Sequence, residues 1–149
     1  IRFPRGLASG KDKERHKYDF SFSGLKTAVA RYIEGAQARG EEFSPEDVCA
    51  GFSEAVNDSL TSKAVRAALD TIVVGGGFSA NSRLRSLLSA RAEAAGIEVR
   101  MPPLRFCTDN GAQIAALTSE LVRAGVAPSD WDFSPDSSMA LTHPSVLPR

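Results

Sequence analysis

The sequence contains few of the residues that mark a disulfide-rich or a histidine-rich metal protein. Its 149 residues include two cysteines and two histidines. Cys49 and Cys107 are too few for a disulfide framework, so we expect both to be free, buried thiols in a reducing compartment. His16 and His143 are far apart in the chain, and neither lies four residues from a second histidine or a cysteine. Neither histidine therefore forms a recognisable metal motif.

Long apolar runs and the common catalytic loops are missing as well. No apolar stretch approaches the roughly 18 residues of a membrane span, and no signal-peptide pattern is present, so we expect a cytoplasmic protein without membrane contact. Neither Gly-x-x-x-x-Gly-Lys-Ser/Thr nor Gly-x-Gly-x-x-Gly occurs, and Gly-x-Ser-x-Gly is also absent. The chain begins Ile-Arg-Phe-Pro instead of with Met, and we expect a piece of a longer protein.

Charge is balanced overall but unevenly distributed. Lys and Arg total 18, as do Asp and Glu. Residues 1–31 hold eight basic and three acidic residues, so this segment carries 8 − 3 = +5 and the rest of the chain carries −5. Such asymmetry is compatible with a solvated basic face or with an anionic partner such as a nucleic acid.

Local signals divide the chain into four segments. Residues 1–22 form a basic N-terminal arm, 23–70 a helical segment, 71–127 a strand–helix–strand–helix unit, and 128–149 an extended tail. Gly40 is expected to end a helix that starts near Ser23, and Ser44 to cap the next one, with Pro45 at its first position. The expected inner face of that second helix consists of Val48, Phe52, Ala55, Val56, Ser59, Leu60 and Ala64.

The order strand–helix–strand–helix predicts a parallel α/β unit. Thr71–Val74 is apolar after its first residue, as in a strand buried on both faces, and Ile97–Met101 alternates apolar with charged residues. The helices between and after these strands are expected to end at Gly96 and Gly125. Two strands make a poor sheet, so either an upstream segment or a homo-oligomer is expected to complete it.

Three consecutive glycines follow the first strand. Gly75, Gly76 and Gly77 carry no Cβ, so a ligand can approach the main chain, and the next helix offers a positive N-terminus to a phosphate. Asn81 stands where its amide can contact a ribose or a phosphate oxygen. It is equally well placed to cap the helix, and one side chain can do both.

Asp109 precedes the last helix in the run Cys107-Thr108-Asp109-Asn110-Gly111. An aspartate at a helix start is usually a cap. With Asn110 beside it and a glycine in the first turn, it is also a reasonable ligand for a hard metal or a contact for a ribose. No residue is assigned a catalytic role.

Three blocks of the sequence resemble one family. They are Asp19–Thr27 (DFSFSGLKT), Val73–Arg85 (VVGGGFSANSRLR) and Cys107–Ala112 (CTDNGA). In order and spacing these blocks are similar to the C-terminal portion of the TsaD family of tRNA N6-adenosine threonylcarbamoyltransferases, formerly called O-sialoglycoprotein endopeptidase or glycoprotease. The family often has Ala at the place of Gly75 and Val at the place of Phe78, which are mild departures.

The resemblance implies an actin-like, ribonuclease H-like fold and transfer of a threonylcarbamoyl group from its adenylate, derived from ATP, to N6 of the adenosine next to the tRNA anticodon. It implies that Asp109 is one ligand of a divalent metal, iron in the family, whose two histidine ligands lie upstream of this chain. It also implies substrate or nucleotide contacts at Gly76, Gly77 and Asn81. The implied partners are tRNA, a paralogous subunit and a small ATPase. Because two metal ligands are missing, the chain alone is expected to be inactive.

Three other functions stay open at this point. A small-molecule kinase of the same superfold would also use a glycine turn near its nucleotide. The older family label implies a metal-dependent glycoprotein endopeptidase, although no residue here supplies an activated water with a general base. A non-catalytic module could dock a partner through the helices of 23–70, with the glycine turn only structural.

Overall fold

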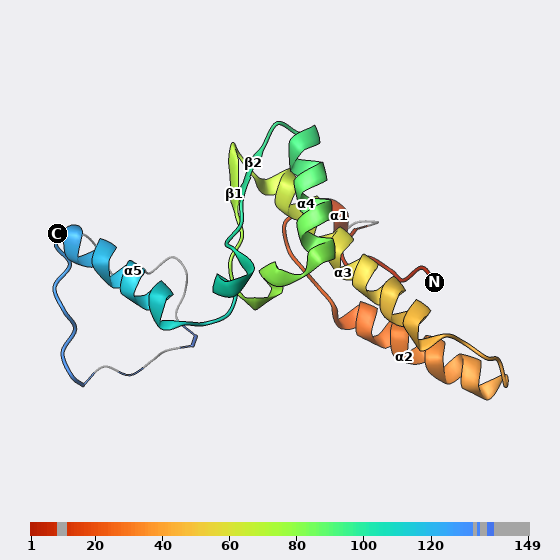
Figure 1. Ribbon diagram of the computed structural model, residues 1–149. Helices are drawn as coiled ribbons and strands as arrows, with labels where there is room; N and C mark the ends of the chain where they lie inside the picture. The colour runs from red at the N-terminus through yellow and green to blue at the C-terminus, as the bar shows by residue number, and fades with distance from the viewer. Residues whose placement is uncertain (9–11, 133, 135–136, 139–149) are drawn as a thin grey trace. The chain divides into compact units, whose positions relative to one another are not determined.

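Figure 1 shows the computed structural model, which describes residues 1–8, 12–132, 134 and 137–138. The chain divides into two compact units, Ile1–Cys107 and Thr108–Arg149. The elements of the first unit are α1 (Asp12–Arg15), α2 (Ser23–Ala38), α3 (Pro45–Ala67), β1 (Thr71–Val73), η1 (Gly77–Ala80), α4 (Ser82–Ala94), β2 (Glu98–Arg100) and η2 (Leu104–Phe106). In the second unit, α5 spans Gly111–Arg123. None of the helices within the described residues has the length and apolar character that a membrane crossing requires.

The helix boundaries agree with the capping signals in the sequence. The Ser44 hydroxyl accepts a hydrogen bond from the Asp47 backbone N–H at 3.0 Å, and Pro45 is the first helical residue of α3. Gly40, Gly96 and Gly125, which follow α2, α4 and α5, all have positive φ, as predicted for helix ends. The division into four sequence segments stays a prediction, and the boundary between the two units falls inside the predicted segment 71–127.

The core of the first unit lies where the N-terminal residues meet α2 and α3. Phe3, Leu25, Val48 and Ala55 are buried together. Gly51 allows this contact, because a Cβ at that position would stand 2.5 Å from the Ile1 carbonyl oxygen. The N-terminal residues therefore pack directly against the α3 backbone.

Hydrogen bonds of two basic side chains, Lys63 and Arg5, also attach the N-terminal segment to α3. The buried Lys63 ammonium donates hydrogen bonds to the backbone carbonyls of Leu7 (3.5 Å), His16 (3.2 Å) and Asp19. Arg5 donates to the Asp58 carboxylate at 2.8 Å. One of the eight basic residues in 1–31 is thus paired inside the protein and contributes little to a field outside it.

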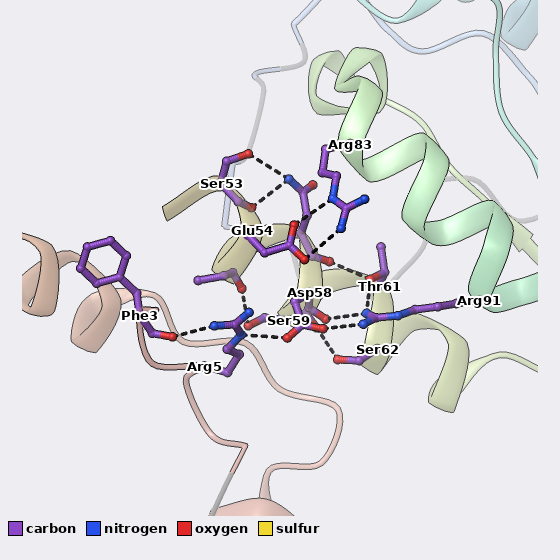
Figure 2. Close-up of polar contacts among 12 residues, drawn as sticks. Phe3, Arg5, Ser53, Glu54, Asp58, Ser59, Thr61, Ser62, Arg83 and Arg91 are labelled. Carbon is purple, nitrogen blue, oxygen red and sulfur yellow. Dashed lines mark hydrogen bonds and ion pairs between the residues drawn. The ribbon is translucent and has the colours of Figure 1, made fainter. Parts of the chain in front are cut away.

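Asp58 also binds α4, as Figure 2 shows. Arg91 donates to the Asp58 carboxylate at 2.5 Å, to the Asp58 carbonyl at 3.1 Å and to the Thr61 hydroxyl at 2.6 Å. A second, exposed pair joins Arg83 to Glu54 at 2.8 Å. The N-terminal segment and α4 therefore meet at one carboxylate on α3.

The predicted parallel unit is confirmed. Strand β1 pairs with β2 in parallel, with Ile72 opposite Val99, and α4 connects them. Leu84, Leu88 and Ala92 are the buried residues of α4, which packs along α3 (Figure 1). The fold is an α/β arrangement in which the helical segment precedes a strand–helix–strand–helix order, as predicted.

Burial differs from the prediction at several positions. Val73 on β1 is 76% exposed, so the strand is not buried on both faces, because the described part of the chain covers only one side of the pair. Phe52 on the expected inner face of α3 is exposed, while Asn57 and Thr61 are fully buried. Cys49 is exposed, so the expectation of a buried thiol is wrong there, whereas Cys107 is buried as expected.

Three buried polar side chains of α3 donate hydrogen bonds to their own helix, while the buried Oδ1 of Asn57 has no partner among the described residues. The Thr61 hydroxyl donates to the Asn57 carbonyl at 2.7 Å, the Ser59 hydroxyl to the Ala55 carbonyl at 2.8 Å, and the Asn57 amide to the Ser53 carbonyl at 2.9 Å. A polar group that is hydrogen-bonded can be buried at modest cost. The spacing of apolar residues therefore could not predict that the buried face of α3 includes Asn57, Ser59 and Thr61.

Removal of the Asp58 carboxylate should destabilise the first unit. In Asp58→Ala, Arg5 and Arg91 lose their shared partner, and we expect the free energy of unfolding to fall by about 2–4 kcal/mol in urea denaturation. Glu54→Ala is the matched control, because it breaks an exposed pair that is worth about 0–1 kcal/mol. Equal losses in the two variants would contradict the central role of Asp58.

The stabilisation by Asp58 should also depend on pH. Burial raises the pKa of this carboxyl, but the hydrogen bonds and charges of Arg91 and Arg5 outweigh burial and lower the pKa below its ordinary value of 3.8. The stabilising effect is therefore fully present above that value and is lost as the pH falls through the lowered pKa. The difference between wild type and Asp58→Ala in unfolding free energy should shrink in this acidic range, and a constant difference from pH 7 to pH 2 would refute it.

Candidate functional site

The candidate residues occupy the two loops that follow the parallel strands. Both strands end at the same edge of the sheet, and η1 and η2 lie at that edge (Figure 1). The loop after β1 carries Gly76, Gly77 and Asn81, and the segment after β2 continues to Asp109. In open α/β sheets, ligands bind outside the carboxyl ends of the strands. The topology thus places the predicted residues on segments that start at the edge where such sheets usually bind ligands.

The glycine turn presents an accessible backbone. A Cβ added at Gly75, Gly76 or Gly77 would meet no atom within 4 Å, and all three residues are exposed. Gly76 has φ +80° and ψ 171°, a conformation adopted almost only by glycine. The Ser79 backbone N–H and hydroxyl both donate to the Gly76 carbonyl, at 3.0 and 2.6 Å, and close the turn.

Asn81 is the N-cap of α4. Its Oδ1 accepts a hydrogen bond from the Leu84 backbone N–H at 2.9 Å. The other end of the amide, Nδ2, has no hydrogen-bond partner among the described residues and carries two N–H donors. The capping role is therefore confirmed, and it leaves Nδ2 available for the ligand contact that stays a prediction.

The cap of α5 is Asn110, and Asp109 takes no part in it. The Asn110 Oδ1 accepts from the Gln113 backbone N–H at 3.1 Å, and its Nδ2 donates to the Thr108 carbonyl at 2.7 Å. Asp109 is exposed, and no hydrogen bond or ion pair engages its carboxylate among the described residues. Of the two residues expected to act as a pair, only Asp109 keeps its side-chain oxygens available.

Gly76, Gly77 and Asn81 lie together in the first unit, within one turn and the start of one helix, whereas Asp109 belongs to the second unit. The described residues contain no group of three His, Cys, Asp or Glu side chains that could hold a metal ion. Asp109 thus offers one carboxylate ligand, and further ligands would have to come from another part of the protein.

Sequence reasoning missed one residue of this region. Arg85, in the first turn of α4, donates hydrogen bonds to both loops. No sequence motif predicts that an arginine will donate hydrogen bonds to backbone carbonyls far away in the chain. Its only signal in the sequence is its place within the block Val73–Arg85, which by itself predicts no role for it.

These features define an α/β protein with parallel strands, a glycine turn before a capped helix, and candidate ligand contacts on the loops at the carboxyl ends of the strands. The family model described as tRNA N6-adenosine threonylcarbamoyltransferase matches residues 1–116. The chain belongs to this family, as the resemblance of its three sequence blocks predicted.

Curated relatives carry the same name. The protein called tRNA N6-adenosine threonylcarbamoyltransferase from Corynebacterium diphtheriae is 52% identical over 98% of this chain and 43% of its own length. The proteins of that name from Bifidobacterium longum and Corynebacterium aurimucosum are 51% and 47% identical over 98% and 100% of this chain. The chain spans less than half the length of each of these relatives.

Alanine should be tolerated differently at two neighbouring glycines. Gly76→Ala forces a side chain into a glycine-only conformation, and we expect it to lower the free energy of unfolding by about 1–3 kcal/mol. Gly75→Ala is the control, because Gly75 has no positive φ and open space around it, and its effect should stay within about 0.5 kcal/mol. Chemical denaturation of both variants tests this, and an equal response would contradict the conformational argument.

Substitutions at Asn81 should separate its cap from any ligand contact. Asn81→Ala removes the acceptor for the Leu84 N–H and should cost about 1 kcal/mol of unfolding free energy. Asn81→Asp keeps an acceptor oxygen and should remain close to wild type in stability while it loses the Nδ2 donor. If Asn81→Asp is as unstable as Asn81→Ala, the cap is not what stabilises α4.

Proposed function

We propose that this chain is the C-terminal part of an enzyme that transfers a threonylcarbamoyl group from threonylcarbamoyl-adenylate to N6 of the adenosine next to the tRNA anticodon. The observation that carries the proposal is the family match over residues 1–116, which includes both candidate loops and Asp109. The actin-like fold of the whole enzyme belongs to the same proposal, and the α/β arrangement with parallel strands is compatible with it.

In the proposed reaction, N6 of the adenosine forms a bond to the carbamoyl carbon, the bond from that carbon to the adenylate oxygen breaks, and AMP leaves while N6 loses a proton. The exposed glycine turn would bind the nucleotide through its backbone, because no side chain blocks the approach. The Asn81 Nδ2 would donate to a ribose or phosphate oxygen while its Oδ1 keeps the start of α4 in place.

Asp109 would be the ligand that this chain contributes to a divalent metal, with iron as the proposed ion. Its carboxylate suits the role, because it is exposed and unengaged among the described residues and because a carboxylate oxygen binds such metals. When bound, the metal supplies a Lewis acid for the acyl group. Two histidines from the preceding part of the enzyme would complete the ligands, so the isolated chain would be inactive.

The proposed partners are tRNA, a paralogous subunit and a small ATPase, in the cytoplasm. Exposed basic residues near α1, Lys13, Arg15 and Lys17, support a contact with tRNA phosphates. Arg5 is excluded from that surface by its pairing with Asp58. Either the preceding part of the enzyme or a homo-oligomer of the chain would cover the exposed side of the strand pair.

The test uses a full-length chimera, in which this chain replaces the matching part of the relative from Corynebacterium diphtheriae. With partner subunits, tRNA, threonine, bicarbonate and ATP, we expect threonylcarbamoyladenosine in the nucleosides read by mass spectrometry. Its absence from an otherwise folded chimera would count against the transferase and favour a kinase, a glycoprotein endopeptidase or a binding module.

In the same chimera, Asp109→Ala should lower the rate of tRNA modification by about 100-fold or more, because a first ligand of the metal is lost. Asp130→Ala is the control, since Asp130 is an exposed aspartate of the same unit outside the family match and should leave the rate unchanged. Modification at the wild-type rate by Asp109→Ala would exclude the ligand role.

A further inference from the structure

One guanidinium joins the two loops at the carboxyl ends of the strands. The Arg85 Nε donates to the Ser79 carbonyl at 2.6 Å in the first loop. The Nη2 of the same residue donates to the Pro102 carbonyl at 2.5 Å and to the Cys107 Sγ at 3.5 Å in the second loop. All four residues belong to the first unit.

In each loop, Arg85 contacts a buried residue that closes a turn by a backbone hydrogen bond. Ser79 is 1% exposed and closes the glycine turn two residues before Asn81. Cys107 is also 1% exposed, and its backbone N–H donates to the Leu104 carbonyl at 3.1 Å to close η2. Cys107 is the last residue of the first unit, and the chain continues from it through Thr108 to Asp109. Arg85 thus holds the point from which the Asp109 segment departs.

The acceptors of Arg85 distinguish it from other arginines of the first unit. Arg5, Arg83 and Arg91 each pair with a carboxylate of α3. Among the described residues, the acceptors of Arg85 are two carbonyls and a thiol. A guanidinium is planar and rigid, so donors on Nε and Nη2 hold their two acceptors at a fixed separation. Arg85 is therefore better suited to hold two backbone segments at a set separation than to neutralise a carboxylate.

We propose that Arg85 is a positioning residue, which sets the separation of the two loops within the first unit and thereby fixes both Asn81 and the point at Cys107 from which the Asp109 segment continues. The inference rests on the proposed function for the identity of the ligands that Asn81 and Asp109 bind. Arg85 touches neither substrate nor metal in this role and acts through the Ser79 carbonyl and the Cys107 segment.

The experiment compares Arg85→Gln, Arg85→Lys and Arg83→Gln in the full-length chimera. Arg83 is the matched control, two residues earlier on α4, and its partner is the exposed Glu54. Three quantities are measured, namely the thermal unfolding midpoint, the affinity for Mn²⁺ by electron paramagnetic resonance, and kcat and KM for tRNA modification. Mn²⁺ serves as the probe because its binding is measured without catalysis.

We expect Arg85→Gln to weaken Mn²⁺ binding about tenfold, equivalent to about 1.4 kcal/mol, and to lower kcat about tenfold with little change in KM for tRNA. Arg85→Lys should behave similarly, since an ammonium cannot donate along both fixed directions at once. Arg83→Gln should stay within about twofold of wild type in all of these quantities.

A lowered unfolding midpoint with unchanged Mn²⁺ affinity and kcat would overturn the positioning role, and so would full rescue by Arg85→Lys. If Arg85→Gln fails to fold, Arg85→Lys carries the comparison, and failure of both makes Arg85 a purely structural residue. A wild-type chimera that binds Mn²⁺ without modifying tRNA refutes the proposed function, while the Mn²⁺ comparison still decides the role of Arg85. A wild-type chimera that binds no Mn²⁺ overturns the inference itself.

Discussion

The Asp58 carboxylate lies between two arginines that come from opposite directions in the sequence. Arg5 reaches it from the N-terminal residues and Arg91 from the end of α4. Apolar burial in the first unit is modest, and its buried cluster joins the N-terminal residues with α2 and α3 but contains no residue of α4. The ion pairs therefore link α4, and with it the strand pair and both loops, to the N-terminal residues. In Figure 2, the Asp58 side chain of α3 lies between Arg5 and Arg91 and pairs with both.

Local chemistry made much of the fold predictable. The Ser44-Pro45 start of α3, the glycine that ends each of three helices, and the parallel order of the strands follow from short-range signals, and the structure confirms them. The degree of burial could not be predicted in the same way. The exposure of Val73 depends on what covers a sheet, and the burial of Thr61 depends on a hydrogen bond to its own helix. Both are properties of packing that no local pattern records.

In the candidate site, too, local features could be predicted from the sequence and long-range contacts could not. The glycine conformation at Gly76 and the cap at Asn81 are local, and the sequence was sufficient to anticipate both. The cap of α5 went to Asn110 where Asp109 was the usual expectation, because neighbouring Asp and Asn residues compete for one position. Arg85 had no assigned role, since its acceptors are 6, 17 and 22 residues away and two of them are backbone atoms. A long-range hydrogen bond to a backbone carbonyl cannot be predicted from the sequence, because every residue type supplies that acceptor.

The contacts of Lys63 have a consequence for how this protein can change in evolution. Its ammonium binds the carbonyl oxygens of Leu7, His16 and Asp19, and every amino acid supplies the same carbonyl group. Side chains at these three positions can therefore be replaced without loss of the attachment, provided that the backbone path is kept. The constraint falls on a single lysine in α3, while the surface of the loop that it holds is free to diverge and to adapt to different partners.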